Sequence, residues 1–168
     1  MLVPNNGKNI AFIGLGSNID DPIYQITKAY NFLKNNKNIF EIAISSLYET
    51  PPLGNQNQDN FINAVAKINT NLSYNELHIL LKLIEKSHKK KVVNIWGPRT
   101  LDLDLLSYND MSINTKELII PHPGVQYRNF VIVPWYEIEP SFVLPNNIKI
   151  SALFLKIDKN IRKIKSIC

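Results

Sequence analysis

FINAVAKI, residues 61–68, is the most informative stretch for the choice of fold. Its side chains divide, as in a β-strand, into two sets on opposite faces: Ile62, Ala64, Ala66 and Ile68 on one, and Phe61, Asn63, Val65 and Lys67 on the other. Ser73 and Glu76 then have the spacing of a helix capping box, and apolar residues continue at helical spacing through Ile84. This part of the chain therefore predicts a strand followed by an amphipathic helix that ends near His88.

Similar patterns flank this unit. Residues 10–15 predict a buried strand, and residues 22–34 predict an amphipathic helix that begins with Asp21 and Pro22. Residues 39–48 and 100–107 predict further strands. The order strand, helix, strand, strand, helix, strand indicates an α+β sandwich with helices packed on one face of an antiparallel sheet.

Composition limits the class of protein. The length of 168 residues and a hydrophobic content of 45% predict a single domain spanning residues 1–168. The polar residues 1–9 do not resemble a signal peptide, no apolar run approaches membrane-spanning length, and the only cysteine is Cys168. We therefore expect a cytoplasmic protein with no membrane partner.

The net charge of +5 favours an anionic partner, either nucleotides or nucleic acid. A compositionally biased genome, rich in Lys, Asn and Ile, explains most of this excess as well, and the same interpretation covers the basic stretch 156–165. Charge alone does not choose between the two kinds of partner.

The segment WGPRTLDLDLL, residues 96–106, carries the clearest chemistry. Strand alternation places Asp102 and Asp104 on one face and the intervening leucines on the core face. Two adjacent carboxylates repel each other unless cations lie between them, and such oxygen ligands suit Mg²⁺ that bridges nucleotide phosphates. Arg99 could bind phosphate oxygens in a bidentate contact. The alternative is an ordinary solvated strand face; His122, Arg128 and Phe130, in another compact segment, favour a site.

Several blocks of the sequence resemble the 6-hydroxymethyl-7,8-dihydropterin pyrophosphokinase family. They occur in the family's order and cover about residues 10–145. They are FIGLGSN at 12–18, SSLYETPPLG at 45–54, FINA at 61–64, WGPRTLDLD at 96–104, and Pro121-His122-Pro123 followed by Arg128, Phe130, Pro134, Glu137 and Pro140. Any one block could arise by chance, but together they are specific.

The resemblance implies a ferredoxin-like α+β fold that binds ATP, two Mg²⁺ ions and a pterin. It also implies a monomer whose loops at 51–60 and around Trp96 close over the site. The catalytic residues would be Arg99, Asp102 and Asp104, with both aspartates as metal ligands. The pterin would contact Thr50, Pro51, Leu53, Phe61, Asn63 and Phe130, and ATP would contact Trp96, Arg99, His122 and Arg128. The pterin's hydroxymethyl oxygen would attack the β-phosphorus of ATP, and AMP would leave.

Two other interpretations stay open at this point. A nucleic-acid-binding module suits the basic charge, but the aromatic RNA-binding signature is missing and the acid pair would repel a phosphate backbone.

A non-catalytic relative is suggested by one departure from the family, since Ile95 stands where relatives commonly carry arginine and the preceding cations are Lys89, Lys90 and Lys91. We expect this loop to give a slower enzyme; an Ile95→Arg variant with unchanged turnover would contradict that expectation. Glu85 has a family counterpart whose role the sequence does not reveal.

Overall fold

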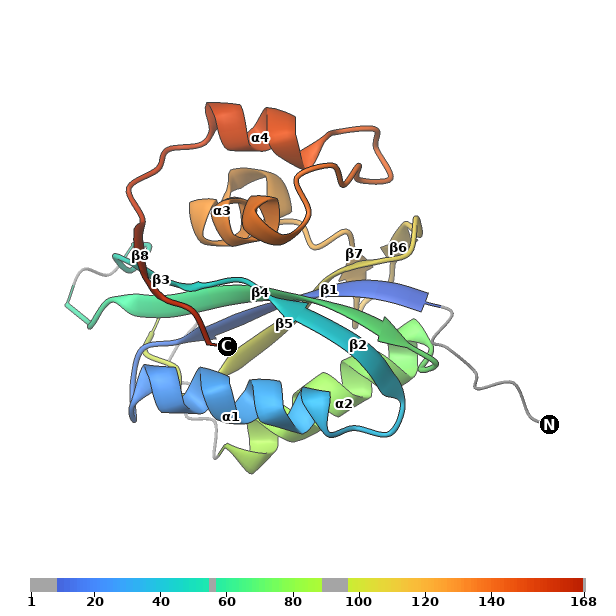
Figure 1. The fold of residues 1–168 in the computed structure, drawn as a ribbon, viewed down its shortest axis with the longest axis horizontal. Helices are drawn as coiled ribbons and strands as arrows, with labels where there is room; N and C mark the ends of the chain where they lie inside the picture. The colour runs from blue at the N-terminus through green and yellow to red at the C-terminus, as the bar shows by residue number, and fades with distance from the viewer. Residues whose placement is uncertain (1–8, 55–56, 89–96, 168) are drawn as a thin grey trace.

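The computed structural model describes residues 9–54, 57–88 and 97–167, and its middle layer is an antiparallel sheet (Figure 1). The first part of the chain forms β1 (Asn9–Ser17), α1 (Pro22–Lys34), β2 (Ile39–Ile44), β3 (Leu47–Thr50), β4 (Phe61–Thr70), α2 (Tyr74–Ser87) and β5 (Asp102–Tyr108). The strand order is β5-β1-β4-β3-β8, with β2 also paired to β4. The predicted α+β class is confirmed, and the predicted order up to β5 holds except that two strands stand where one was expected between α1 and β4.

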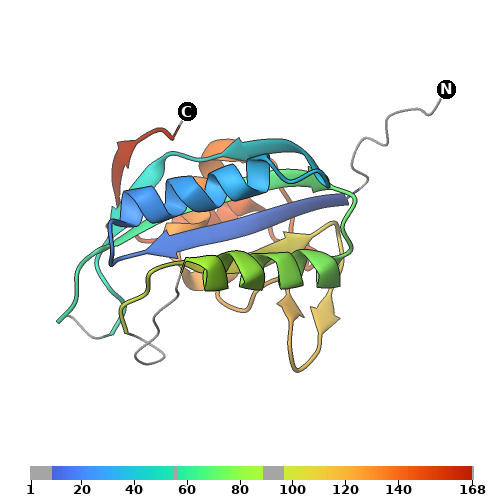
Figure 2. The ribbon, with the colours of Figure 1, turned by 90° about the horizontal axis from the view of Figure 1, so that it is seen from below.

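Local capping explains why the first two helices begin where they were expected. Asp21 accepts a hydrogen bond from the backbone N of Tyr24 ahead of Pro22, and Ser73 and Glu76 form a complete capping box. Both helices lie on the same face of the sheet (Figure 2). Their apolar sides pack on Ile62, Ala64, Ala66 and Ile68, together with Ala11, Ile13 and Leu15 of β1. This is the first of two cores.

The predicted strand over residues 39–48 was wrong as a single element. β2 ends at Ile44, β3 begins at Leu47, and both pair with β4. At the break, the backbone N of Val65 donates to the hydroxyl of Ser45 at 3.0 Å, where a backbone carbonyl would otherwise accept. The backbone N of Ser46 donates to the Glu137 carboxylate instead of to a strand. Side chains thus replace part of the sheet ladder here, while the backbone N of Ser45 still donates to the Val65 carbonyl at 2.9 Å.

A second helical layer covers the opposite face of the sheet. α3 (Asn129–Ile138) and α4 (Ile150–Lys156) lie there, so helices cover both faces and the expectation of one covered face was incomplete (Figure 1). The rings of Phe12 and Trp135 stack with centroids 4.4 Å apart, and both side chains are fully buried. Val65 joins this second core. The second set of β4 side chains therefore faces protein and not solvent.

The remaining elements are short. β6 (Ile113–Asn114) pairs with β7 (Ile119–Ile120), the 3₁₀ helix η1 spans Val125–Tyr127, and β8 (Arg162–Lys165) pairs with β3. Arg162 donates from Nε to the carboxylate of Glu49 at 2.9 Å. Part of the basic stretch attributed to genome composition thus has a structural role as an edge strand. Within the described ranges, no helix combines the length and the apolar character needed to cross a membrane.

Glu137 joins the second layer to the broken edge of the sheet. Its carboxylate accepts hydrogen bonds from the Tyr48 hydroxyl at 2.7 Å and the Ser46 hydroxyl at 2.8 Å, and Lys163 lies 3.3 Å away. Burial raises the pKa of the Glu137 carboxyl, but the hydrogen bonds from Tyr48 and Ser46 outweigh burial and hold the pKa below its ordinary value. The ionised form is therefore the one that stabilises the fold.

This contact predicts a pH-dependent stability. A carboxyl whose pKa is depressed on folding contributes stability above its unfolded pKa and loses it as the pH falls through the folded pKa. Glu137→Gln should lower the free energy of unfolding by about 1–2 kcal/mol at pH 7, since hydrogen bonds to a charged group contribute on that scale. The deficit should shrink as the pH falls from the ordinary value of 4.5. Urea denaturation of both proteins between pH 7 and pH 3 measures this; a deficit that stays constant would contradict it.

Candidate active site

One cavity of about 320 Å³ opens on the α3 side of the sheet, above the C-terminal part of β1. Two glycines of β1 make room for it. Gly16 pairs with Asn63 of β4 on one side and with Asp102 of β5 on the other. A Cβ atom at Gly16 would come within 3.1 Å of Asn63 Oδ1. At Gly16, β1 therefore has no side chain between the predicted pterin residues and the acid pair.

The structure brings nearly all of the predicted site residues to this cavity. Its lining includes Thr50, Pro51, Leu53, Phe61, Asn63, Arg99, Asp102, Asp104, His122, Arg128 and Phe130. Pro51 and Leu53 are exposed, whereas Thr50 and Asn63 are buried. Trp96, the loop cations Lys89, Lys90 and Lys91, and Ile95 fall outside the described residues. The described residues thus lie around one cavity, and the role of each in binding or catalysis is a proposal.

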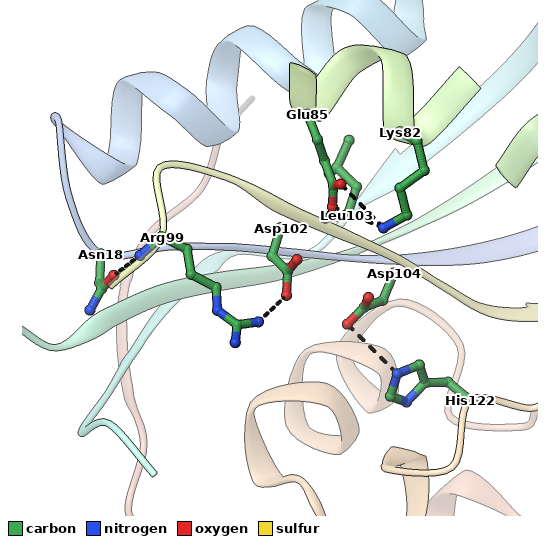
Figure 3. Close-up of polar contacts among 8 residues, drawn as sticks. All are labelled: Asn18, Lys82, Glu85, Arg99, Asp102, Leu103, Asp104 and His122. Carbon is green, nitrogen blue, oxygen red and sulfur yellow. Dashed lines mark hydrogen bonds and ion pairs between the residues drawn. The ribbon is translucent and has the colours of Figure 1, made fainter. Parts of the chain in front are cut away.

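The acid pair has the alternation expected of a strand (Figure 3). Leu101, Leu103 and Leu105 are buried in the first core, while Asp102 and Asp104 face the cavity. Asp102 forms an ion pair with Arg99, with 2.8 Å between Oδ2 and Nη1. Asp104 Oδ2 lies 3.9 Å from His122 Nε2. Each carboxylate thus has its own nitrogen-bearing partner, Arg99 just before β5 for Asp102 and His122 later in the chain for Asp104.

His122 is held as a neutral donor. The backbone N of Gly124 donates to Nδ1 at 3.0 Å, so the ring proton of the neutral form lies on Nε2, the nitrogen nearer Asp104. Burial lowers the pKa of His122, and the opposing effect of Asp104 is smaller. The backbone N of His122 also donates to the Leu106 carbonyl at 2.9 Å, which ties its loop to β5. His122 can therefore offer an N–H to an anion without carrying a full charge.

On the other side of Gly16, Asn63 and Thr50 form a polar pair within an apolar wall. Asn63 Nδ2 donates to Thr50 Oγ1 at 2.9 Å, and both side chains are buried. Phe61, on the same strand face, and Phe130 of α3 also line the cavity, and the Arg128 guanidinium lies 5.7 Å from the centre of the Phe130 ring. Flat rings around an orienting amide suit a planar, polar heterocycle.

The role of Glu85, which the sequence left open, is visible in Figure 3. Its Oε1 accepts a hydrogen bond from the backbone N of Leu103 at 2.7 Å, on the outer edge of β5 and between the two aspartates. Lys82 Nζ lies 3.2 Å from each Glu85 oxygen, and the Glu85 side chain is only 4% exposed. Glu85 therefore supports the strand that carries the acid pair.

We expect Glu85→Ala to lower the free energy of unfolding by about 2 kcal/mol, the cost of leaving a buried backbone donor without its acceptor. Glu85→Gln keeps a carbonyl oxygen in reach of Leu103 and should recover at least half of that loss. Lys86→Ala, at an exposed position of the same helix, controls for shortening a side chain on α2. Chemical denaturation measures all three. Equal losses for Ala and Gln would mean that charge, and not this hydrogen bond, is what Glu85 contributes.

The donor set for a metal consists of two carboxylates. Among the described residues, no group of three or more His, Cys, Asp or Glu side chains could enclose an ion. Asp102 and Asp104 nevertheless fit Mg²⁺, which is commonly bound through one or two carboxylates while substrate phosphates and water complete its shell. The arrangement thus suits a metal that arrives with a nucleotide better than a permanent metal centre.

Comparison with known proteins shows the family of the chain. The family model of 7,8-dihydro-6-hydroxymethylpterin-pyrophosphokinase matches residues 12–140. The 2-amino-4-hydroxy-6-hydroxymethyldihydropteridine pyrophosphokinase of Haemophilus influenzae is 42% identical over 137 residues, which cover 82% of this chain and 86% of that protein. A folic acid synthesis protein of Dictyostelium discoideum is 35% identical over 84% of this chain and 21% of its own length.

The fold has matching solved structures. An HPPK-DHPS protein of Plasmodium falciparum, crystallised with pteroate, superposes with a TM-score of 0.73 at 17% identity, over 95% of this chain and 45% of that one. The present chain therefore spans about half the length of such a protein. At this identity the likeness concerns the fold alone.

Proposed function

Because the chain belongs to the 7,8-dihydro-6-hydroxymethylpterin-pyrophosphokinase family, whose members act in folate synthesis, we propose that its cavity transfers the terminal diphosphate of ATP to 6-hydroxymethyl-7,8-dihydropterin. The observation that carries this proposal is the placement of the Asn63–Thr50 pair and of the acid pair on opposite sides of the bare strand at Gly16. A ring bound on one side can present its hydroxymethyl group to phosphates bound on the other. Such positioning is a large part of what phosphoryl-type transfer requires.

The acid half of the cavity would hold the nucleotide's phosphates. Asp102 and Asp104 would bind two Mg²⁺ ions, which, when bound, neutralise charge on the transferred oxygens. Arg99 could exchange its contact with Asp102 for phosphate oxygens, and Arg128 would add a second guanidinium. His122 would donate from Nε2, and Trp96 remains an expected ATP contact from the family resemblance.

The polar amide half would hold the pterin. Asn63 keeps its Oδ1 above Gly16 while Nδ2 is held by Thr50, so the carbonyl oxygen can accept from an N–H on the ring. Phe61 and Phe130 would stack on the ring faces, with Pro51 and Leu53 at the rim. In the reaction, a bond forms between the hydroxymethyl oxygen and the β-phosphorus, the bond from that phosphorus to the α-phosphate oxygen breaks, AMP leaves and the hydroxyl proton is released.

The nucleic-acid alternative has little support in this fold. In ferredoxin-like RNA binders, bases stack on an open sheet face. Here helices cover both faces across the described part of the chain, and Phe12 and Val65 are buried under α3. A small-molecule pocket, and not a sheet surface, is what the second layer leaves accessible. We further propose that residues 1–168 work as one monomeric domain in the cytoplasm, where ATP is available.

The direct test is to incubate the protein with ATP, Mg²⁺ and 6-hydroxymethyl-7,8-dihydropterin and to quantify AMP and the pterin diphosphate by chromatography. Equal amounts of the two products, dependent on Mg²⁺, would support the proposal. ADP in place of AMP would indicate transfer of one phosphate only. Binding of both substrates without any product would favour the non-catalytic alternative.

A further inference from the structure

Asn18 connects the two halves of the site, although the sequence did not mark it as a candidate site residue. It follows β1 and is only 1% exposed. Its Oδ1 accepts from the backbone N of Arg99 at 2.8 Å, and its own backbone N donates to the Arg99 carbonyl at 3.1 Å. Figure 3 shows Asn18 beside Arg99, and next to it the Arg99 side chain reaching Asp102. Residue 99 is thus held at three points.

The other end of the same amide reaches the opposite wall. Asn18 Nδ2 donates to Gln58 Oε1 and to the Asp59 carbonyl, both at 3.0 Å. These residues lie three and two positions before Phe61, where β4 and the Asn63 side of the cavity begin. The orientation of the amide follows from its partners, because Oδ1 faces an N–H and Nδ2 faces a backbone carbonyl. Every hydrogen-bonding atom of this buried side chain is therefore occupied across two loops.

We propose that Asn18 is a positioning residue that sets the separation of the nucleotide and pterin halves, by tying Arg99 to the segment Gln58–Asp59. This inference rests on the proposed function. A buried amide with partners on both walls leaves little freedom for one wall to shift relative to the other, and misplacing reacting groups by about 1 Å can cost about a hundredfold in rate. The amide contacts Arg99 at its backbone and touches none of the atoms that would react, so its effect on turnover is indirect.

Two substitutions separate the two ends of the amide. Asn18→Asp keeps an oxygen toward the Arg99 N–H but replaces the donor with a second oxygen. Gln58 can rotate its own amide to donate to that oxygen, whereas the Asp59 carbonyl cannot, so this contact becomes repulsive. Asn18→Ala removes both connections. Asn9→Ala, at the other end of β1, is the matched control.

We would first measure binding, which does not require turnover. Titrations with 6-hydroxymethyl-7,8-dihydropterin, followed by its fluorescence, and with α,β-methylene-ATP plus Mg²⁺ give the two affinities for each variant. Asn18→Asp should weaken pterin binding about tenfold, the scale of one lost buried hydrogen bond, and leave nucleotide affinity within about twofold. Asn18→Ala should weaken both, and hydrogen exchange at the Arg99 amide should speed up in Ala but not in Asp.

Turnover then tests positioning itself. With both substrates saturating, we expect kcat to fall by about 10–100-fold in Asn18→Ala, because binding can be restored by concentration but alignment cannot. Variants that lower only the denaturation midpoint, with affinities and kcat of the folded fraction equal to those of Asn9→Ala, would overturn the proposal. So would equal loss of both affinities in Asn18→Asp. If the wild type binds both substrates but transfers nothing, the proposed function fails while the binding and exchange results still decide the role of Asn18.

Discussion

Asp104→Asn is expected to lower turnover by about a thousandfold, the scale seen when one element of transition-state charge stabilisation is removed. The amide keeps the size of the carboxylate and its place on β5 but is a much weaker ligand for Mg²⁺. The fold should tolerate the change, because the variant also removes one of two neighbouring negative charges from the cavity wall. Turnover and stability are therefore predicted to move independently.

A second measurement ties that loss to the metal. With α,β-methylene-ATP and Mg²⁺ at about 100 times the dissociation constant, the wild type should gain about 2.7 kcal/mol of stability by mass action. Asp104→Asn should gain far less under the same conditions. Asp110→Asn, in the exposed turn after β5, is the control for losing an aspartate near this strand. A variant that retains both the Mg²⁺-dependent gain and wild-type turnover would exclude Asp104 as a metal ligand.

The second large effect is expected at Asn63. Asn63→Leu keeps a similar volume but removes the only side-chain amide among the cavity-lining residues that the structure describes. Sites built to hydrogen-bond a substrate discriminate strongly when one of the polar partners is missing, so we expect kcat/KM for the pterin to fall by about 10²–10³-fold. The affinity for Mg²⁺ and α,β-methylene-ATP should stay within a factor of about two, because the nucleotide half lies across Gly16.

The matched control is Asn69→Leu, a substitution of the same kind at the far end of β4. It should leave kcat/KM unchanged. Asn63→Leu also removes the donor to the buried Thr50 hydroxyl. The double variant with Thr50→Val therefore separates this structural cost, visible in denaturation, from the loss of recognition. Restored pterin affinity in the double variant would mean that Asn63 acts only through Thr50.

Much of the candidate site was predictable because the relevant patterns are short. The alternation of aspartate and leucine from residue 101 to 105 placed the acid pair on the cavity face, and β4 alternates in the same way from Phe61. Helix starts at Asp21 and Ser73 were equally local, since a cap reaches only the next turn. The blocks of family resemblance then connected residues that periodicity leaves unrelated.

Other features had no local signal. α3 contains Pro134 and has no side-chain cap at its start, which are poor indications of a helix. It forms because Trp135, Val131 and Ile132 bury their side chains against the sheet. The break between β2 and β3 depends on the contact of Ser46 with Glu137, 91 positions away along the chain. A window of ten or fifteen residues cannot contain both partners.

The sequence by itself therefore predicts most of the strands and helices through β5, and it places the two aspartates on one strand face, because both follow from periods of 2 and 3.6 residues. What required the folded molecule is which of those side chains meet. Antiparallel pairing in one register puts Gly16 between Asn63 and Asp102, and it brings Asn18 within hydrogen-bonding distance of Arg99, 81 positions later. Strand register is set by packing of the whole sheet against its two helical layers, so no single stretch of the chain contains it.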